Sequence, residues 1–175
     1  MPTAIVREVV GTKLAETIRA RLMRAGYTRF ALLDRGSYEH CDGVDEPDLL
    51  RALAELASEI TGRRLVLDHA RALRLRAGDY LLLHHDRVHH DRPVELVLDL
   101  SPAPVLAAEV HYRHRGQVYF TFGCDPGAMA LVERGPTVMC NHTYVSKLHE
   151  RAEVVRLVLL FRGASSPSIH FGATL

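Results

Sequence analysis

A histidine-rich stretch at positions 78–93, GDYLLLHHDRVHHDRP, contains the pattern His-x-Asp twice. Residues two apart on a β-strand point to the same face. His84 and Asp86 end an apolar run, so both side chains can reach one metal ion if that run is extended. The second copy, His89 to Asp91, follows the point where the strand turns. The spacing therefore predicts a metal site on the first copy and places His89 at the rim, as a candidate substrate contact.

A third ligand is needed, because two protein ligands do not hold an iron ion. Two histidines and one carboxylate form a facial triad that leaves three metal positions open for a co-substrate and O2. This ligand should lie on a later strand that faces the same interior. His142, in TVMCNHTYV, is the best placed candidate, and His149 is the alternative.

One arginine lies in a strongly apolar stretch near the end of the chain. Arg156 is in VVRLVLLF, where an unpaired charge would be costly to bury. A bound diacid could supply a carboxylate that pairs with both ends of the guanidinium. The alternative is a structural ion pair with Glu153 or with a residue on a neighbouring strand.

The elements that must position these residues fall into two groups along the chain. Capping and stop signals predict a helix from Thr12 to Gly26 and another from Pro47 to Gly62. The polar stretch 34–46 is interpreted as a loop, with Tyr38 in it as a candidate substrate contact. From residue 64 onward, short apolar or alternating runs are separated by Gly, Pro, Asp or Asn, which is typical of antiparallel strands. These runs are RRLVLDHARALRL, GDYLLLHHD, PVELVLDLS, AEVHYRH, GQVYFTF, AMALVER, PTVMCNH and VVRLVLLFR.

Two helices followed by about eight strands predict an α+β fold, with both helices on one outer face of a closed or two-layered sheet. The 175 residues fit a single domain. We expect a helical support region at 1–62, a barrel core at 63–162 and a tail at 163–175.

Composition excludes some classes of protein. The net charge of +1 comes from scattered charges, which argues against a nucleic-acid partner. Neither a membrane span nor a signal peptide is visible, so we expect a cytoplasmic protein without a membrane partner. The three cysteines have no CxxC spacing and are expected to be reduced thiols.

Several stretches together resemble the prolyl-hydroxylase-type branch of the Fe(II)- and 2-oxoglutarate-dependent oxygenases. GDYLLLHHD is similar to that family's Gly-Asp-aromatic-Leu-x-x-His-x-Asp stretch, and RPVELVLDL resembles its next strand. HTYV followed by VVRLVLLF resembles the end of the core, where a histidine ligand precedes an arginine. EITG, at 59–62, looks like the helix end that leads into the core. The resemblance covers roughly residues 3–162.

The resemblance implies a double-stranded β-helix, the jelly-roll core also found in cupins. It implies His84, Asp86 and His142 as the Fe(II) ligands, and Arg156 as the residue that binds the distal carboxylate of 2-oxoglutarate. The expected reaction is the hydroxylation, with O2, of an unactivated C–H bond. The expected substrate is a small molecule, an amino acid or a peptidyl residue.

The interval of 14 residues from His142 to Arg156 is a few residues longer than the family usually shows, and the chain departs from the family pattern at two further places. Asp99 stands where a tyrosine often helps to hold the co-substrate, and residues 107–110 replace a Gly-Gly-Glu-Leu turn. Tyr80 or Tyr112 could take over the role of that tyrosine, and Tyr80 is our candidate for binding the co-substrate. These departures favour the alternative that the chain is a mononuclear non-haem metal enzyme, or a ligand-binding barrel of the same fold, that does not use 2-oxoglutarate.

Two further interpretations stay open. His111 and His114 lie in the predicted hairpin HYRHRG, where half-exposed positions are usual, but His111 could line the barrel mouth and contact substrate. A module that zinc stabilises without catalysis is a different class of protein, and it predicts unfolding when the metal is removed.

Overall fold

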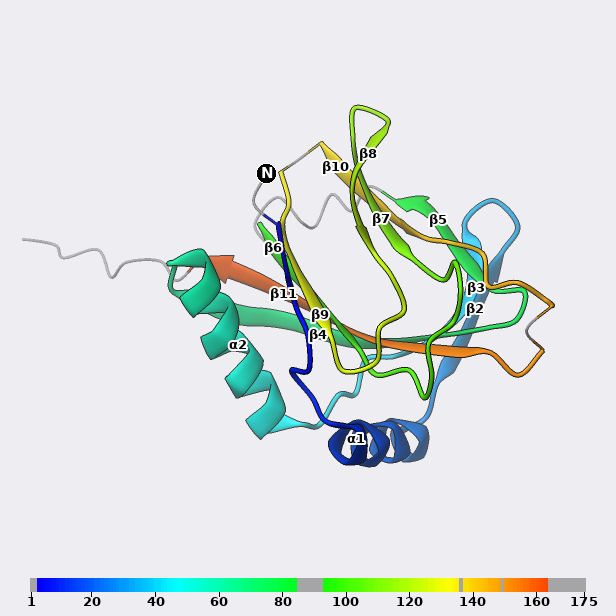
Figure 1. Ribbon diagram of the computed structural model, residues 1–175, viewed down its shortest axis with the longest axis horizontal. Helices are drawn as coiled ribbons and strands as arrows, with labels where there is room; N and C mark the ends of the chain where they lie inside the picture. Colours follow the sequence, from blue (N-terminus) through cyan, green and yellow to red (C-terminus); the bar gives the residue numbers. More distant parts are fainter. Residues whose placement is uncertain (1–2, 85–92, 136, 149, 164–175) are drawn as a thin grey trace, which may run out of the picture.

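The computed structural model describes residues 3–84, 93–135, 137–148 and 150–163, with the backbone alone for residues 83 and 84. Within these ranges the chain forms two helices and eleven strands (Figure 1). In chain order these are β1 (Thr3–Val6), α1 (Thr12–Ala25), β2 (Thr28–Leu32), β3 (Gly36–Cys41), α2 (Pro47–Thr61), β4 (Leu65–Arg76), β5 (Tyr80–His84), β6 (Val94–Asp99), β7 (Val110–His114), β8 (Gln117–Phe122), β9 (Met129–Glu133), β10 (Val138–His142) and β11 (Glu153–Gly163). The eight runs that the sequence predicted as strands are β4 to β11, and both predicted helices are confirmed.

All the strand pairs are antiparallel, and the strands follow the order β1-β9-β6-β11-β4-β3-β5-β10-β7-β8, with β2 paired to β3. The sheet bends into a nearly closed barrel, in which β9, β6, β11 and β4 face β5, β10, β7 and β8 (Figure 1). We call these the helix-side layer and the opposite layer. Two four-stranded layers in this order form a jelly roll, which confirms the predicted core.

The prediction of a loop over 34–46 was wrong, because β3 lies within it. This strand joins the two layers, pairing Glu39 with Arg74 on β4 and Ser37 with Tyr80 on β5. Its polar composition hid its strand character, since cross-layer pairing, rather than an apolar pattern, holds it. Gly36 has a φ of +147°, and a Cβ there would lie 2.5 Å from the Tyr80 carbonyl oxygen. A glycine is therefore required where β3 meets β5.

The helix-side layer has two apolar faces. Buried residues of the helices belong to the same cluster as the outward-facing residues of β6 and β11, which include Leu98 and Leu157. Both helices lie outside the barrel (Figure 1). Alternate residues point the other way, so Val97 packs between the layers with Tyr112 of β7 and Cys140 of β10. This alternation decides which β11 side chains enter the barrel.

We predict that Leu98→Ala lowers the free energy of unfolding by about 2–5 kcal/mol, because it leaves a cavity under the helices. Leu33→Ala is the matched control, since Leu33 is 99 % exposed and should change stability by less than about 0.5 kcal/mol. Urea denaturation followed by circular dichroism measures both. Equal effects for the two variants would contradict this assignment of the core.

Candidate functional site

Arg156 lies in the middle of β11 and points into the barrel. Its neighbours Val155 and Leu157 belong to the helix-side cluster, so the intervening side chain must face inward. The residue is 1 % exposed. Its Nη1 lies 2.9 Å from Nδ1 of His142, and its Nη2 donates a hydrogen bond of 2.8 Å to the Ala108 carbonyl oxygen. Its Nε is buried and has no hydrogen-bond partner in the described structure.

The charge of Arg156 is not neutralised by direct contact with a carboxylate of the described chain. Burial lowers the pKa of its guanidinium below the ordinary value, and the negative charge of Asp99 is the largest effect opposing this. Asp99 is the β6 residue paired with Arg156, but its oxygens accept hydrogen bonds from the amides of Ser101 (2.7 Å) and Asp125 (2.8 Å). Arg156 is thus a buried cation bound by neutral acceptors, an arrangement that an added carboxylate would stabilise.

A second buried arginine provides the comparison. Arg134, just after β9, is 5 % exposed, and its Nη1 donates to Oε2 of Glu95 in a buried ion pair. Burial lowers the pKa of Arg134, but Glu95, together with Cys140 and Tyr112, outweighs burial, so the pKa is raised. Within the described part of the chain, Arg134 is therefore paired with a carboxylate, whereas Arg156 is not.

His142 ends β10 and is buried beside Arg156. An arginine side chain can only donate hydrogen bonds, so Nδ1 of His142 is the acceptor in their contact. The imidazole in this contact is neutral, which is the form that binds metals. The structure thus brings together two of the residues predicted from the sequence, at positions 14 residues apart.

The strand of the His-x-Asp pattern is adjacent to that of His142. The backbone of His84 pairs with Cys140, Leu81 pairs with His142, and the register shifts between these two pairs. The regular alternation of an extended strand is therefore interrupted within the apolar run that ends at His84.

Several predicted residues fall outside the part of the chain that the structure describes. These are Asp86, His89 and His149, together with the side chain of His84. Among the described side chains, no group of three His, Cys, Asp or Glu residues could hold a metal ion. Metal binding by His84, Asp86 and His142 stays a prediction.

Three other candidates lie on β3, β5 and β7, and not on the strands of Arg156 and His142. The Tyr80 hydroxyl donates to the Leu33 carbonyl oxygen at 3.3 Å, outside the barrel interior. His111 is on the face of β7 opposite to Tyr112, and its Nε2 is 2.7 Å from Oε2 of Glu109. Tyr38 is buried in β3, within an apolar cluster. Their proposed roles in binding stay predictions.

Sequence reasoning missed the buried ion pair of Glu95 and Arg134. Tyr112, considered as a substitute for the missing tyrosine, donates a 2.6 Å hydrogen bond to Oε1 of Glu95 instead. A signal was present in PVELVLDL, where Glu95 and Asp99 are four residues apart in an apolar run. That spacing places both carboxylates on the inward face of one strand.

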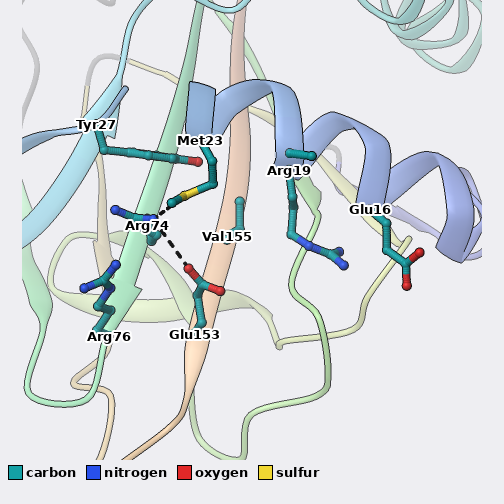
Figure 2. Close-up of a pocket in the computed structure, with 9 residues that line it drawn as sticks. Glu16, Arg19, Met23, Tyr27, Arg74, Arg76, Glu153 and Val155 are labelled. Atoms are coloured by element: carbon teal, nitrogen blue, oxygen red, sulfur yellow. Dashed lines mark hydrogen bonds and ion pairs between the residues drawn. The ribbon is translucent and has the colours of Figure 1, made fainter. Parts of the chain in front are cut away.

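A cavity of about 360 Å³ lies outside the barrel, between α1 and strands β4 and β11 (Figure 2). It opens on the face of β11 opposite to Arg156, since Val155 lines it. Arg74 packs on the Tyr27 ring, 4.2 Å from its centroid, and its guanidinium lies 2.5 Å from Glu39 and 3.7 Å from Glu153. Carboxylates already pair with this arginine, so the cavity offers weaker support for an anion site than Arg156 does.

Asp79, in the Gly-Asp pair before β5, fixes the start of that strand. Its carboxylate accepts hydrogen bonds from the Arg29 guanidinium at 2.6 and 2.9 Å, from the Ser37 hydroxyl at 2.8 Å and from the Arg76 amide at 2.9 Å. Burial raises the pKa of this carboxyl, but these hydrogen bonds outweigh burial and the pKa is lowered. Asp79 therefore anchors β5 to β2, β3 and β4.

Comparisons with known proteins agree with the topology. No family model matches the sequence, and no curated protein matches it significantly. Among solved structures, an oxidoreductase of the 2OG-Fe(II) oxygenase family from Burkholderia pseudomallei is similar, with a TM-score of 0.73 and 13 % identity, covering 93 % of this chain and 88 % of that one. A Pseudomonas putida prolyl-4-hydroxylase matches at 0.65 and 15 %, covering 93 % of each chain. SnoN, a non-heme alpha ketoglutarate dependent epimerase from nogalamycin biosynthesis, matches at 0.72 and 12 %, covering 93 % of this chain and 79 % of SnoN.

The chain therefore has the fold of the 2-oxoglutarate- and Fe(II)-dependent oxygenases, as the resemblance predicted. Neither described helix has the length and apolarity that crossing a membrane requires.

We predict that Asp79→Asn lowers the free energy of unfolding by about 1–3 kcal/mol near pH 7, because it weakens buried hydrogen bonds to a charged group. Since the folded-state pKa of Asp79 is lowered, its stabilisation is present above the unfolded pKa of about 3.9 and is lost as the pH falls through the folded value. Urea denaturation at several pH values should show the difference from wild type shrinking below about pH 4. Asp34→Asn, whose side chain is 84 % exposed, is the control. A difference that is independent of pH would contradict the assignment.

Proposed function

We propose that this protein is an Fe(II)- and 2-oxoglutarate-dependent dioxygenase that acts in the cytoplasm. It would hydroxylate an unactivated C–H bond of a small molecule, an amino acid or a peptidyl residue. The observation that carries the proposal is Arg156, a buried guanidinium beside His142 without a carboxylate contact in the described chain, inside a barrel of the matching fold.

The residues of the candidate site fit both Fe(II) and 2-oxoglutarate. Two imidazoles and one carboxylate, from His84, His142 and Asp86, are the donor set that suits non-haem Fe(II). Arg156 fits the far carboxylate of 2-oxoglutarate, since an arginine binds a carboxylate through two parallel hydrogen bonds. Its partnerless Nε supports an added acceptor at this place.

The contact between Arg156 and His142 suggests that iron and 2-oxoglutarate bind cooperatively. A neutral imidazole has one unprotonated nitrogen, and in His142 this nitrogen accepts from Arg156. A metal ion needs a lone pair of the same ring, so metal binding requires Arg156 to release Nδ1. The released Nη1 would then be a buried donor that needs another acceptor, which the co-substrate carboxylate supplies. Iron should therefore raise the affinity for 2-oxoglutarate.

When bound, the iron and 2-oxoglutarate supply the activation of O2, while the chain supplies binding, orientation and an environment with little water. Arg156 would hold one end of the co-substrate. Val97, Tyr112 and Phe122 form an apolar lining between the layers, which would limit the access of water to the reacting groups.

One observation favours the alternative of a same-fold metal enzyme or ligand-binding barrel that does not use 2-oxoglutarate. Asp99 is fully buried and is the strand partner of Arg156. Its negative charge would oppose the entry of a second carboxylate, although it already accepts two backbone hydrogen bonds. The response of the protein to 2-oxoglutarate distinguishes the proposed dioxygenase from this alternative.

We expect anaerobic addition of Fe(II) and then 2-oxoglutarate to produce a weak visible charge-transfer band. Arg156→Ala should weaken 2-oxoglutarate binding by about 10–100-fold, because it removes hydrogen bonds to a charged group. Arg162→Ala is the matched control, since Arg162 is on the same strand with its side chain 60 % exposed. Absence of the band, or equal affinity in both variants, would overturn the co-substrate assignment.

Removal of metal separates this enzyme from a zinc-stabilised module. We expect the thermal midpoint of unfolding to change by only a few degrees when a chelator is added, because the apolar core, and not the metal, holds the barrel. Differential scanning calorimetry with and without chelator measures this. Unfolding by the chelator that zinc reverses would support the module instead.

A further inference from the structure

A group of polar residues lies inside the barrel, apart from the contact between Arg156 and His142. Glu95 on β6 has the same strand parity as Val97 and Asp99, which face inward. Tyr112 of β7 is fully buried, and Arg134 follows β9. We call Glu95, Tyr112, Tyr119 and Arg134 the inner polar cluster.

Some hydrogen-bonding groups of the inner polar cluster are paired with one another. Glu95 accepts hydrogen bonds from the Tyr112 hydroxyl and from Nη1 of Arg134, and Nη2 of Arg134 donates at 3.4 Å to the Val138 carbonyl oxygen. Two donors remain. Nε of Arg134 and the hydroxyl of Tyr119 are buried, and neither has a hydrogen-bond partner within the described structure. A buried polar group without a partner costs about 1–3 kcal/mol, so two in one cluster indicate a place for a ligand atom.

A β-bulge turns Tyr119 inward. Tyr112 pairs with Phe120, but the next residue, Arg113, pairs with Val118, so Tyr119 is the extra residue of β8. As a result, Tyr119 and Phe120 both pack on the apolar residues between the two layers, although they are consecutive in the strand. The charges of Arg134 and Glu95 both act on the Tyr119 hydroxyl, whose pKa burial raises to about 12, so it is a neutral donor at pH 7. Bulges commonly aim a side chain at a functional site.

The cluster lies next to the strands that carry the predicted metal ligands. Cys140 of β10 pairs with Tyr112 on one side and with the backbone of His84 on the other. His142 is two residues further along the same strand. A molecule bound at the inner polar cluster would therefore lie near the proposed iron.

We propose that Nε of Arg134 and the hydroxyl of Tyr119 bind an amide carbonyl oxygen of the substrate. This use of the cluster rests on the proposed function. Arg134 already has a carboxylate partner in Glu95, so a neutral acceptor suffices for its remaining Nε–H. A hydroxyl would bring a donor as well as an acceptor, whereas a carbonyl oxygen offers two lone pairs to two donors. The substrate class is thus one that carries a neutral carbonyl oxygen, for which the amide of a peptidyl residue is our candidate, rather than a free acid or a hydrocarbon.

The test uses the full chain labelled with ¹⁵N, without added iron or 2-oxoglutarate, and N,N-dimethylacetamide as the probe. Titration followed by NMR should shift the Nε–H signal of Arg134 saturably, this signal being assigned by its loss in Arg134→Lys. Tyr119→Phe should weaken binding of the probe about fivefold, the loss of one neutral hydrogen bond. Tyr144→Phe, at a half-exposed residue outside the cluster, should leave binding unchanged.

Shifts that do not saturate, or equal affinity in Tyr119→Phe and wild type, would overturn the proposal. Acetate that binds as tightly as the amide would overturn the choice of a neutral acceptor. If Arg134→Lys does not fold, Tyr119→Phe decides alone. Because neither iron nor 2-oxoglutarate is present, the outcome is independent of the charge-transfer test. If the amide binds but the charge-transfer band does not appear, the binding site at the inner polar cluster stands and the proposed oxygenase function is rejected.

Discussion

The burial of Arg156 is the constraint around which the interior of this barrel is organised. Its strand neighbours Val155 and Leu157 must pack under the helices, so the alternation of β11 forces the guanidinium inward. There it finds a histidine nitrogen and a backbone carbonyl, both neutral. A cation in such a place destabilises the protein unless something of opposite charge compensates it. The simplest compensation is a ligand that carries a carboxylate.

The two buried arginines differ in whether a carboxylate of the described chain contacts the guanidinium. Arg134 has Glu95 in direct contact, so its positive charge is compensated by a carboxylate of the described chain. Asp99, beside Arg156, uses its oxygens to bind the amides that follow β6 and precede β9. Among the residues that the structure describes, Asp99 therefore shapes the backbone at the barrel end, and no ion pair between it and the guanidinium is found. This difference separates an arginine whose charge a carboxylate already compensates from one suited to bind an anion.

Strand β5 depends on contacts from outside the eight-stranded core. Gly36 allows β3 to approach its backbone, and Asp79 ties its first residues to Arg29 on β2. The N-terminal region thus supports the barrel with strands as well as helices. These contacts place the backbone of His84 beside β10, where the register shift brings Leu81 opposite His142. The strands on which the proposed metal site depends are held together by residues distant in the chain.

The sequence alone determined the helices and the eight core strands, and it singled out Arg156, because these depend on local periodicity and on a charge in an apolar run. Only the tertiary structure decided the rest. β3 has no apolar pattern, since partners on β4 and β5 define it. The inner polar cluster joins Glu95, Tyr119 and Arg134 from separate strands, and the bulge that turns Tyr119 inward has no local signature. Contacts between distant strands leave no periodic pattern in the sequence. Only the tertiary structure therefore shows which polar side chains are neighbours inside the barrel.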